Sequence, residues 1–396
     1  MTVLLGKEIV AEKHRQIKKL IGSAGFNLWL IFAREARDPI SPLVVGTRYV
    51  GTAAFLFTKK RKIAICADYD ALALRSMELF DEVIPYSAGI REPLSKVLRK
   101  LQPKRIGVNF SQSDDCADGL SHGMYLFLEE LVSEALSEVE LISAERLAAS
   151  VRAKKTPEEL RRLKEAIRIS DEIFKDMITF IKPGRTELEI GQRCKALAEE
   201  KGAALSEDSL PIVATGKAGL GHRGPSEASV TAGDVVIIDM GICYQGYTSD
   251  FARTYYIPTQ GGTVPDSLLY RFETVRDAIA LAARMIKPGV RGYEPKEAAD
   301  EFIRQRGIDP PLFGLGHQVG IACHDGGLSL GPRSPRYAGR VEQRIEEGTL
   351  FTLEPFLVPK KGEEVFPIGV EEIIRVTANG CEFLTDPQQE MWLTHN

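Results

Sequence analysis

The stretch from Val235 to Ile257, which reads VVIIDMGICYQGYTSDFARTYYI, constrains the fold more than any other part of the chain. Two runs rich in β-branched and aromatic residues flank a Tyr-Gln-Gly segment, a pattern typical of a β-hairpin. Each arm carries one carboxylate, Asp239 in the first and Asp250 in the second. If the chain reverses near Tyr244–Gln245, we expect the two acids to lie opposite each other and to point to the same face.

Two acids on one face of an apolar hairpin repel each other and are poorly solvated unless a cation neutralises them. An aspartate in a turn beside an exposed strand aspartate would need no cation. The hairpin alone therefore leaves a structural and a metal-binding interpretation open, and other segments of the chain must distinguish them.

Length and composition describe an ordinary globular protein with room for two domains. The 396 residues are 44% hydrophobic and 27% charged, which allows a large core. The net charge of −4 and the pI near 6.0 give no electrostatic reason to expect nucleic acid or an anionic membrane as a partner. The N-terminal segment does not read as a signal peptide, and no apolar run approaches the length of a membrane span. The six cysteines form no CxxC pair, which indicates reduced thiols in a cytoplasmic protein.

The expected domains are residues 1–152 and 153–396. In the first, short buried strands alternate with helical patterns, which predicts an α/β domain. The strands are expected at 26–32, 53–57, 62–67, 82–86, 106–110 and 139–143, and the helices at 7–21, 93–101 and 125–135. Capping-box sequences at Thr156–Glu159 and Thr186–Glu189 predict the first two helices of the second domain.

The second domain contains an internal repeat. Ile-Lys-Pro-Gly occurs at 181–184 and again at 286–289, each time after a helical run. The segment 233–239, GDVVIID, is echoed by 348–354, GTLFTLE, so that a glycine, a polar residue, a mostly apolar strand and an acid follow one another in both. Two matches in the same order predict duplicated halves, each of which delivers a carboxylate from the end of a central strand.

Three further segments could supply ligands to a metal. GLGHQVGIACHD holds His317 and His324, LFTLEPF holds Glu354, and PIGVEEIIRV holds Glu371 and Glu372. Two aspartates, one histidine and two glutamates form a hard, mostly oxygen ligand set, which suits two divalent ions about 3.5–4 Å apart. Each residue taken singly also has a structural interpretation. Spacing alone does not choose between the adjacent Glu371 and Glu372.

Together these motifs resemble those of the pita-bread metallopeptidases, which include methionine aminopeptidase, aminopeptidase P, prolidase and the metal-free relative creatinase. The resemblance covers about residues 155–380, and residues 1–152 are similar to the N-terminal domain of the prolidase and aminopeptidase P branch. It implies an α/β N-terminal domain followed by an α+β pita-bread domain. The halves of the latter would be duplicated about a pseudo-two-fold axis around a central antiparallel sheet.

The family motifs match this chain in order. D-x-G and S-D-x-T-R-T fall on the two hairpin aspartates, the G-H-x-x-G-x-x-x-H motif on the two histidines, and x-x-E-P on the first glutamate. The final acidic ligand of the family falls on the first residue of the Glu-Glu pair. The resemblance therefore implies two divalent metal ions per chain, Mn, Zn or Co, held by Asp239, Asp250, His317, Glu354 and Glu371.

The resemblance also implies catalytic and substrate-binding roles. Glu354 would take a proton from the attacking water and pass it to the leaving proline nitrogen. His324, and His222 in the sequence GHRGPS, would donate hydrogen bonds to the oxyanion or to the substrate. The family usually carries an arginine where Gly369 stands here. We therefore expect Arg37 or Arg48 of the N-terminal domain to hold the carboxylate of the substrate proline.

The expected activity is hydrolysis of the Xaa-Pro bond, with release of the N-terminal residue and with dipeptides as the favoured substrates. An aminopeptidase P that acts on longer Xaa-Pro-Xaa peptides has the same chemistry and remains an alternative. A creatinase-like hydrolase or lyase of a small non-peptide substrate, or a non-catalytic binding member of the fold, also remains open. A homodimer is expected from the resemblance alone.

Overall fold

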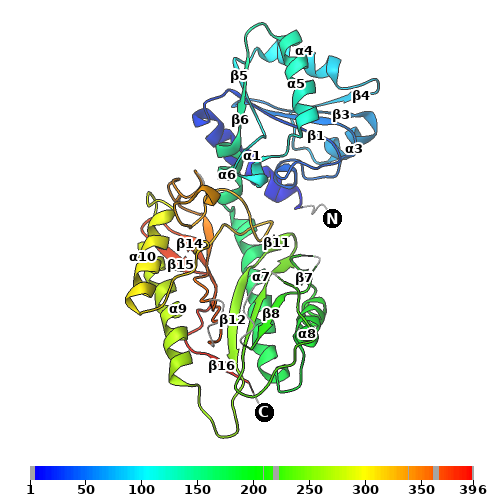
Figure 1. Ribbon diagram of the computed structural model, residues 1–396. Coiled ribbons are helices and arrows are strands. Elements are labelled where there is room, and N and C mark those ends of the chain that lie inside the picture. The colour runs from blue at the N-terminus through cyan, green and yellow to red at the C-terminus, as the bar shows by residue number, and fades with distance from the viewer. Residues whose placement is uncertain (1–4, 208, 217–222, 338, 360–364, 395–396) are drawn as a thin grey trace. The chain divides into compact units, whose positions relative to one another are not determined.

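The computed structural model describes residues 5–207, 209–216, 223–337, 339–359 and 365–394. The chain divides into two compact units, Met1–Glu158 and Glu159–Asn396 (Figure 1). Over the described residues, no helix combines the length and the apolar character needed to cross a membrane.

The first unit is built on a mixed sheet with the strand order β4-β3-β2-β1-β5-β6. Its strands are β1 (Leu28–Ala33), β2 (Ala53–Phe57), β3 (Lys62–Ala67), β4 (Glu82–Tyr86), β5 (Arg105–Val108) and β6 (Glu140–Ser143). Its helices are α1 (Lys7–Leu20), α2 (Ser41–Val44), α3 (Asp68–Ser76), α4 (Arg91–Leu101), α5 (His122–Ala135) and α6 (Glu145–Ala153). Every strand and helix predicted for this region is confirmed, with its ends shifted by no more than a few residues.

Helices cover both faces of this sheet, which explains its continuous apolar strands. β1 reads LWLIFA, and each of its residues is buried. Leu30 of β1 belongs to the same core cluster as Leu94 of α4 and Leu131 of α5. On the opposite face, the His14 ring of α1 meets the Phe57 ring edge-on, with 5.0 Å between ring centroids. The predicted α/β architecture follows from this packing.

The second unit combines long helices with two main sheets. The helices are α7 (Pro157–Phe180), α8 (Glu187–Glu200), α9 (Asp266–Met285) and α10 (Tyr293–Gln305). Within the described ranges, one sheet has the order β16-β12-β9-β8 and another the order β13-β14-β15, while a small sheet has the order β11-β10-β7. The strands are β7 (Ala204–Leu205), β8 (Ile212–Thr215), β9 (Val235–Met240), β10 (Ile242–Tyr244), β11 (Tyr247–Thr248), β12 (Phe251–Tyr256), β13 (Leu350–Leu353), β14 (Glu372–Val376), β15 (Cys381–Phe383) and β16 (Trp392–Leu393). The capping box predicted at the start of α8 is present.

The two Ile-Lys-Pro-Gly segments have the same backbone structure. Their glycines, Gly184 and Gly289, adopt φ angles of 92° and 93°. The N–H of Gly184 donates to the carbonyl of Val230, and the N–H of Gly289 donates to the carbonyl of Ile345, both at 2.9 Å. The predicted repeat is therefore a repeat of structure and not a coincidence of four letters.

The two acid-bearing strands begin in the same way as well. Gly233 and Gly348, two residues before β9 and β13, have φ angles of 93° and 84°. Gly233 N–H donates to the carbonyl of Ile257 at 2.8 Å, and Gly348 N–H donates to that of Val376 at 2.9 Å. β9 then pairs antiparallel with β12, and β13 pairs antiparallel with β14. The pseudo-two-fold duplication predicted for the pita-bread domain is confirmed.

The two halves meet where β12 approaches β14. Glu371 N–H donates to the carbonyl of Ala252 at 3.2 Å, and the Thr254 hydroxyl donates to the carbonyl of Gly369 at 2.6 Å. Arg253, which is fully buried, also donates to the Glu371 carbonyl at 2.9 Å. This join brings the ends of the acid-bearing strands from both halves to one place.

Candidate metal centre

Asp239 and Asp250 are carried by the hairpin that the sequence predicts. The chain reverses at Gln245–Gly246, whose φ angles of 47° and 86° are typical of a type I′ turn. In the pairing of β9 with β12, Ala252 stands opposite Asp239. Asp250 precedes Ala252 by two residues, so the two acids share one face, as predicted. They are diagonal neighbours, however, and not the directly opposed pair that we expected.

His317 reaches the same place from a segment that runs beside β13. Thr352 N–H donates to the carbonyl of His317 at 2.9 Å, and Glu354 N–H donates to that of Leu315 at 2.8 Å. This pairing places His317 Nε2 at 3.5 Å from Glu354 Oε1 and at 3.8 Å from Asp250 Oδ2. The second half of the repeat therefore faces the acids of the first half.

The adjacent Glu371 and Glu372 point to opposite sides of their strand. Ligand atoms of Glu371, Asp250 and His317 all lie within 4.8 Å of one another. Glu372 instead accepts a hydrogen bond from Arg253 at 3.1 Å, and both partners of this pair are buried. Because neighbouring residues of a strand face opposite ways, only one of the two glutamates can join the cluster, and it is Glu371.

The clustered acids resist ionisation when no cation is present. Burial raises the pKa of Asp250 to about 7. Burial, followed by the charges of Asp239 and Asp250, raises the pKa of Glu354 well above its usual range. The pKa of Glu371 is also raised well above its usual range, by burial first and then by the other three carboxylates. A divalent cation would reverse these shifts, because a nearby opposite charge favours the ionised form.

One atom of the cluster also has the environment expected of a metal ligand. Glu371 Oε1 is buried and has no hydrogen-bond partner among the described residues. A buried acceptor without a partner is costly, and such atoms are rare in native proteins. Carboxylates together with one imidazole are ligands that Mn²⁺, Zn²⁺ and Co²⁺ accept. The residues present therefore fit divalent metal.

Comparison with known proteins identifies the family. Residues 161–378 match the model of metallopeptidase family M24. The chain belongs to this family. An Xaa-Pro dipeptidase from Bacillus anthracis has a solved structure that superposes with a TM-score of 0.74 at 26% identity, covering 97% of this chain and 99% of that chain. An X-Pro aminopeptidase from Thermotoga maritima gives a TM-score of 0.72 at 26% identity, with 96% and 99% covered.

A sequence relative agrees with these structures. An Xaa-Pro dipeptidase from Pyrococcus furiosus is 26% identical over 321 residues, which cover 78% of this chain and 86% of that enzyme. The resemblance to the prolidase and aminopeptidase P branch of the pita-bread metallopeptidases is thus confirmed, and so is the two-domain fold. Like other M24 enzymes, the chain is a metallopeptidase that uses divalent metal.

Four further residues were predicted to bind substrate or to take part in catalysis, and the structure describes three of them. The His324 ring lies beside that of His317, with 4.1 Å between centroids and 30° between planes, and His324 is exposed. His222 lies outside the described residues, so its role stays a prediction. Arg37 and Arg48 are exposed residues of the first unit, and their role in binding substrate also stays a prediction.

Thr352 is a member of the M24 site that the sequence analysis missed. Its hydroxyl oxygen accepts a hydrogen bond from His317 N–H at 3.1 Å. The same hydroxyl is within hydrogen-bonding reach of the Glu354 and Glu371 carboxylates, where it offsets a small part of the rise that burial causes in the pKa of both acids. Thr352 stands two residues before Glu354 in a predicted strand, and this spacing alone places it on the ligand face.

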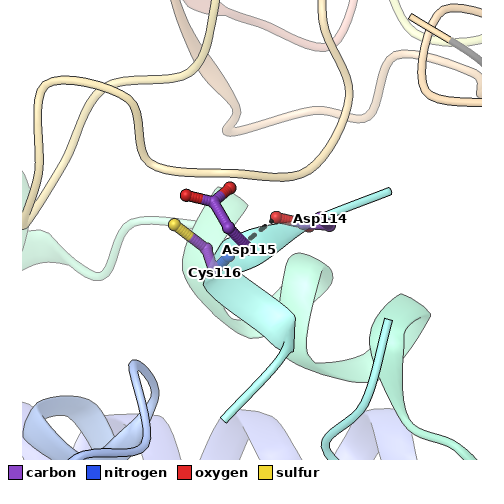
Figure 2. Close-up of side chains that lie close together, drawn as sticks. All are labelled: Asp114, Asp115 and Cys116. Carbon is purple, nitrogen blue, oxygen red and sulfur yellow. Dashed lines mark hydrogen bonds between the residues drawn. The ribbon is translucent and has the colours of Figure 1, made fainter. Parts of the chain in front are cut away.

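A second group of metal-ligand atoms lies in the first unit, away from the M24 motifs. Asp114, Asp115 and Cys116 carry such atoms within 4.8 Å of one another (Figure 2). Asp114 accepts a hydrogen bond from Cys116 N–H at 3.1 Å and so caps the short helix Asp115–Ala117, while Asp115 is exposed. Helix capping accounts for this arrangement, and we assign no metal to it.

Proposed function

We propose that this M24 metallopeptidase hydrolyses the Xaa-Pro peptide bond and releases the N-terminal residue, with dipeptides as its preferred substrates. The observation that carries this proposal is the cluster in which Asp250, His317 and Glu371 lie within 4.8 Å of one another, with Glu354 at 3.5 Å from His317. The similarity to proteins named Xaa-Pro dipeptidase supports the substrate class.

The proposed cofactor is a pair of divalent ions, Mn, Zn or Co. When bound, such ions lower the pKa of water at the site and polarise the substrate carbonyl. The raised pKa values of the buried acids and the orphaned oxygen of Glu371 support this assignment. The ligands would be Asp239, Asp250, His317, Glu354 and Glu371.

The chain supplies the groups that move protons. Glu354 would accept the proton of the attacking water, because its carboxylate lies within the ligand cluster, with Oε1 at 3.5 Å from His317 Nε2. It would then deliver this proton to the proline nitrogen, which leaves as an amine. His324, exposed beside His317, would donate a hydrogen bond to the developing oxyanion, and we propose the same role for His222.

Specificity for proline would come from shape and charge. The tertiary Xaa-Pro amide has no N–H, so a site that requires that hydrogen bond rejects it. A pocket shaped for the pyrrolidine ring would accept it instead. We propose that Arg37 or Arg48 holds the proline carboxylate, because Gly369 offers no cation at the position where the family usually has an arginine.

Two further properties belong to the same proposal. The chain would act in the cytoplasm as a homodimer without nucleic acid or membrane partners, and its domains would be residues 1–152 and 153–396. An aminopeptidase P activity on longer Xaa-Pro-Xaa peptides is the second candidate, supported by the similarity to the Thermotoga maritima X-Pro aminopeptidase. A metal-dependent creatinase-like reaction on a small non-peptide substrate is the third.

A panel of substrates tests the proposal directly. The metal-stripped protein is assayed on Xaa-Pro dipeptides, Xaa-Pro-Xaa tripeptides and Met-Ala peptides after addition of Mn²⁺, Co²⁺ or Zn²⁺. We expect metal-dependent cleavage with the highest kcat/KM on dipeptides. Higher kcat/KM on tripeptides would favour the aminopeptidase P activity, and metal binding without cleavage of any Xaa-Pro bond would refute the proposed reaction.

The double variant Arg37→Ala/Arg48→Ala tests how the proline carboxylate is bound. An unchanged KM for dipeptides in this variant would exclude both arginines as its binding partners.

A further inference from the structure

An open groove of the first unit lies where three segments that are distant in the sequence meet. Its volume is about 820 Å³, and small-molecule sites typically have volumes of about 300–1,000 Å³. Its walls come from α1, from the turn between β2 and β3, and from the segment that joins α6 to α7. All of its lining residues precede residue 161, where the match to the M24 family begins.

The groove is strongly cationic. The described residues that line it include one acid, Glu12, and five cations, which are Arg15, Lys18, Lys19, Lys59 and Lys155. These leave an excess of four positive charges in a chain whose net charge is −4. Like charges gathered in one hollow repel one another and attract anions from solution. The charge of the groove therefore favours an anionic ligand.

α1 contributes one wall of the groove as a stripe. Glu12, Arg15, Gln16 and Lys19 line it, and their spacing of three and four residues places them on one face of the helix. Cations in the last turn of a helix stabilise its C-terminal end, which accounts for Lys18 and Lys19. It does not account for Arg15, nor for the cations that the other two segments supply.

The other two segments are held in place by hydrogen bonds. In the turn between β2 and β3, Thr58 N–H donates to the carbonyl of Arg61 at 2.9 Å, and the Thr58 hydroxyl accepts from Arg61 N–H at 2.8 Å. These bonds fix the turn that carries Lys59. In the segment after α6, the Lys154 carbonyl accepts a hydrogen bond from Gln16 Nε2 at 3.0 Å, which ties this segment to the stripe of α1.

Two oxygen atoms of the α1 stripe indicate what else the ligand carries. Glu12 Oε2 and Gln16 Oε1 are buried and have no hydrogen-bond partner among the described residues. A buried acceptor without a partner is costly. The Glu12 side chain is 18% exposed, so a rotation of its carboxylate can turn an oxygen toward the groove. A ligand with hydroxyl donors beside its anionic groups would satisfy these acceptors, whereas an inorganic anion would not.

We propose that this groove binds a nucleoside di- or triphosphate, with its phosphates on the cations and its sugar hydroxyls on Glu12 and Gln16. A terminal phosphate carries about −1.5 to −2 charges at neutral pH, so more than one phosphate is needed to balance the excess of four positive charges. The inference does not depend on the proposed peptidase reaction, because none of the lining residues is a proposed metal ligand or catalytic residue.

The test is calorimetric titration of ATP into the metal-free full-length chain. Removal of divalent metal prevents ATP from binding through metal ions at the M24 centre. We expect one ATP per chain, with affinity lowered about tenfold or more in Arg15→Gln/Lys59→Gln, because two charged hydrogen-bond donors are lost. Tripolyphosphate, which has no sugar hydroxyls, should bind more weakly than ATP, and Glu12→Ala should narrow this difference.

A matched control comes from α4 of the same unit. Arg99→Gln/Lys100→Gln removes two exposed cations from the last turn of that helix and should leave ATP affinity unchanged. Equal losses in the two double variants, or more than one ATP per chain, would show an adventitious ion only and overturn the inference. Equal affinity for ATP and tripolyphosphate would overturn the assignment of a nucleoside. A wild type that binds no ATP at millimolar concentration would overturn the inference as well.

Discussion

The two halves of the second unit share a backbone but not a set of side chains. Counted from the equivalent glycines, Asp239 in the first half corresponds to Glu354 in the second. Counted back from Ile257 and Val376, which accept equivalent hydrogen bonds, Asp250 corresponds to Gly369. The repeat thus supplies one acid from the same position in each half, whereas the remaining acid of the first half has no counterpart in the second.

The join between the halves shows the same divergence. By the same count, Ala252 corresponds to Glu371, and Arg253 corresponds to Glu372. The last two form a buried ion pair across the join, with 3.1 Å between Arg253 Nη2 and Glu372 Oε2. The repeated backbone therefore brings equivalent positions of the two halves together, and the different residues at these positions form an ion pair on one side of the strands and an asymmetric set of acids on the other.

The largest expected effect is a difference in kcat between variants of the equivalent acids Asp239 and Glu354. Asp239→Asn and Glu354→Gln should both weaken metal binding, but at saturating metal Glu354→Gln should keep a lower kcat. General acid–base groups contribute about 10²–10⁴-fold, and only Glu354 is proposed to move a proton. kcat on an Xaa-Pro dipeptide is the measurement, and Glu382→Gln, at the exposed residue of β15, is the control. Equal losses in kcat would show that Glu354 acts as a ligand only.

The ion pair at the join gives the next largest effect. Arg253→Met leaves Glu372 charged and unpaired in the core, which should cost about 3–5 kcal/mol in the free energy of unfolding. The double variant Arg253→Met/Glu372→Gln should recover much of this loss. Arg375 on the same strand as Glu372 contacts Glu382 at 3.3 Å, but both side chains are well exposed. Arg375→Met should therefore cost less than about 1 kcal/mol. Similar losses at Arg253 and Arg375 in urea unfolding would contradict this account.

The acid cluster should make the metal-free protein unstable at high pH. Folding raises the pKa of Asp250 from 3.8 to about 7, so its contribution to stability is present below the lower value and is lost as pH rises through the higher one. We expect the melting temperature of the EDTA-treated protein to fall by several degrees between pH 5.5 and pH 8. Asp250→Asn should flatten this dependence, and bound metal should reduce it. A metal-free wild type with the same pH profile as Asp250→Asn would contradict the raised pKa.

A smaller effect is expected at Thr352, which occupies the position equivalent to Ile237 of the first half. Thr352→Val removes the hydroxyl that contacts the carboxylates and His317, so metal affinity should fall by about 10–100-fold. Thr352→Ser keeps the hydroxyl and should bind metal nearly as well as the wild type. Ile237→Val is the matched control in the first half and should leave metal affinity unchanged. Calorimetric titration would show whether the serine variant behaves as predicted.

The smallest effect tests how far the duplication extends. Gly233 and Gly348 both adopt positive φ angles, and alanine in that conformation costs about 1–2 kcal/mol. Gly233→Ala and Gly348→Ala should therefore destabilise the protein equally, as judged by urea unfolding. Gly380→Ala is the control, because Gly380 has no positive φ and a Cβ there would meet nothing within 4 Å. Clearly unequal losses would show that the repeated turns are not energetically equivalent.

Much of the fold could be predicted because its signals are local. Apolar runs such as LWLIFA marked the strands of the first unit, and the Thr186 capping box marked the start of α8. The sequence predicted a chain reversal near Tyr244–Gln245, and the turn lies one residue later, at Gln245–Gly246, where both φ angles are positive. The repeat was visible in the sequence because Gly233 and Gly348, which both have positive φ angles, are each followed by a mostly apolar strand that ends in an acid.

The sequence by itself determined the order of the acids, the repeat and the ligand types. The tertiary structure decided which side chains meet. Glu371 and Glu372 are equivalent by pattern, and only the contact of β14 with β12 sends one to the cluster and the other to Arg253. Strand register made Ala252 the partner of Asp239. The spacing of Thr352 from Glu354 places it on the ligand face, but its contact with His317 depends on pairing between segments far apart in the chain.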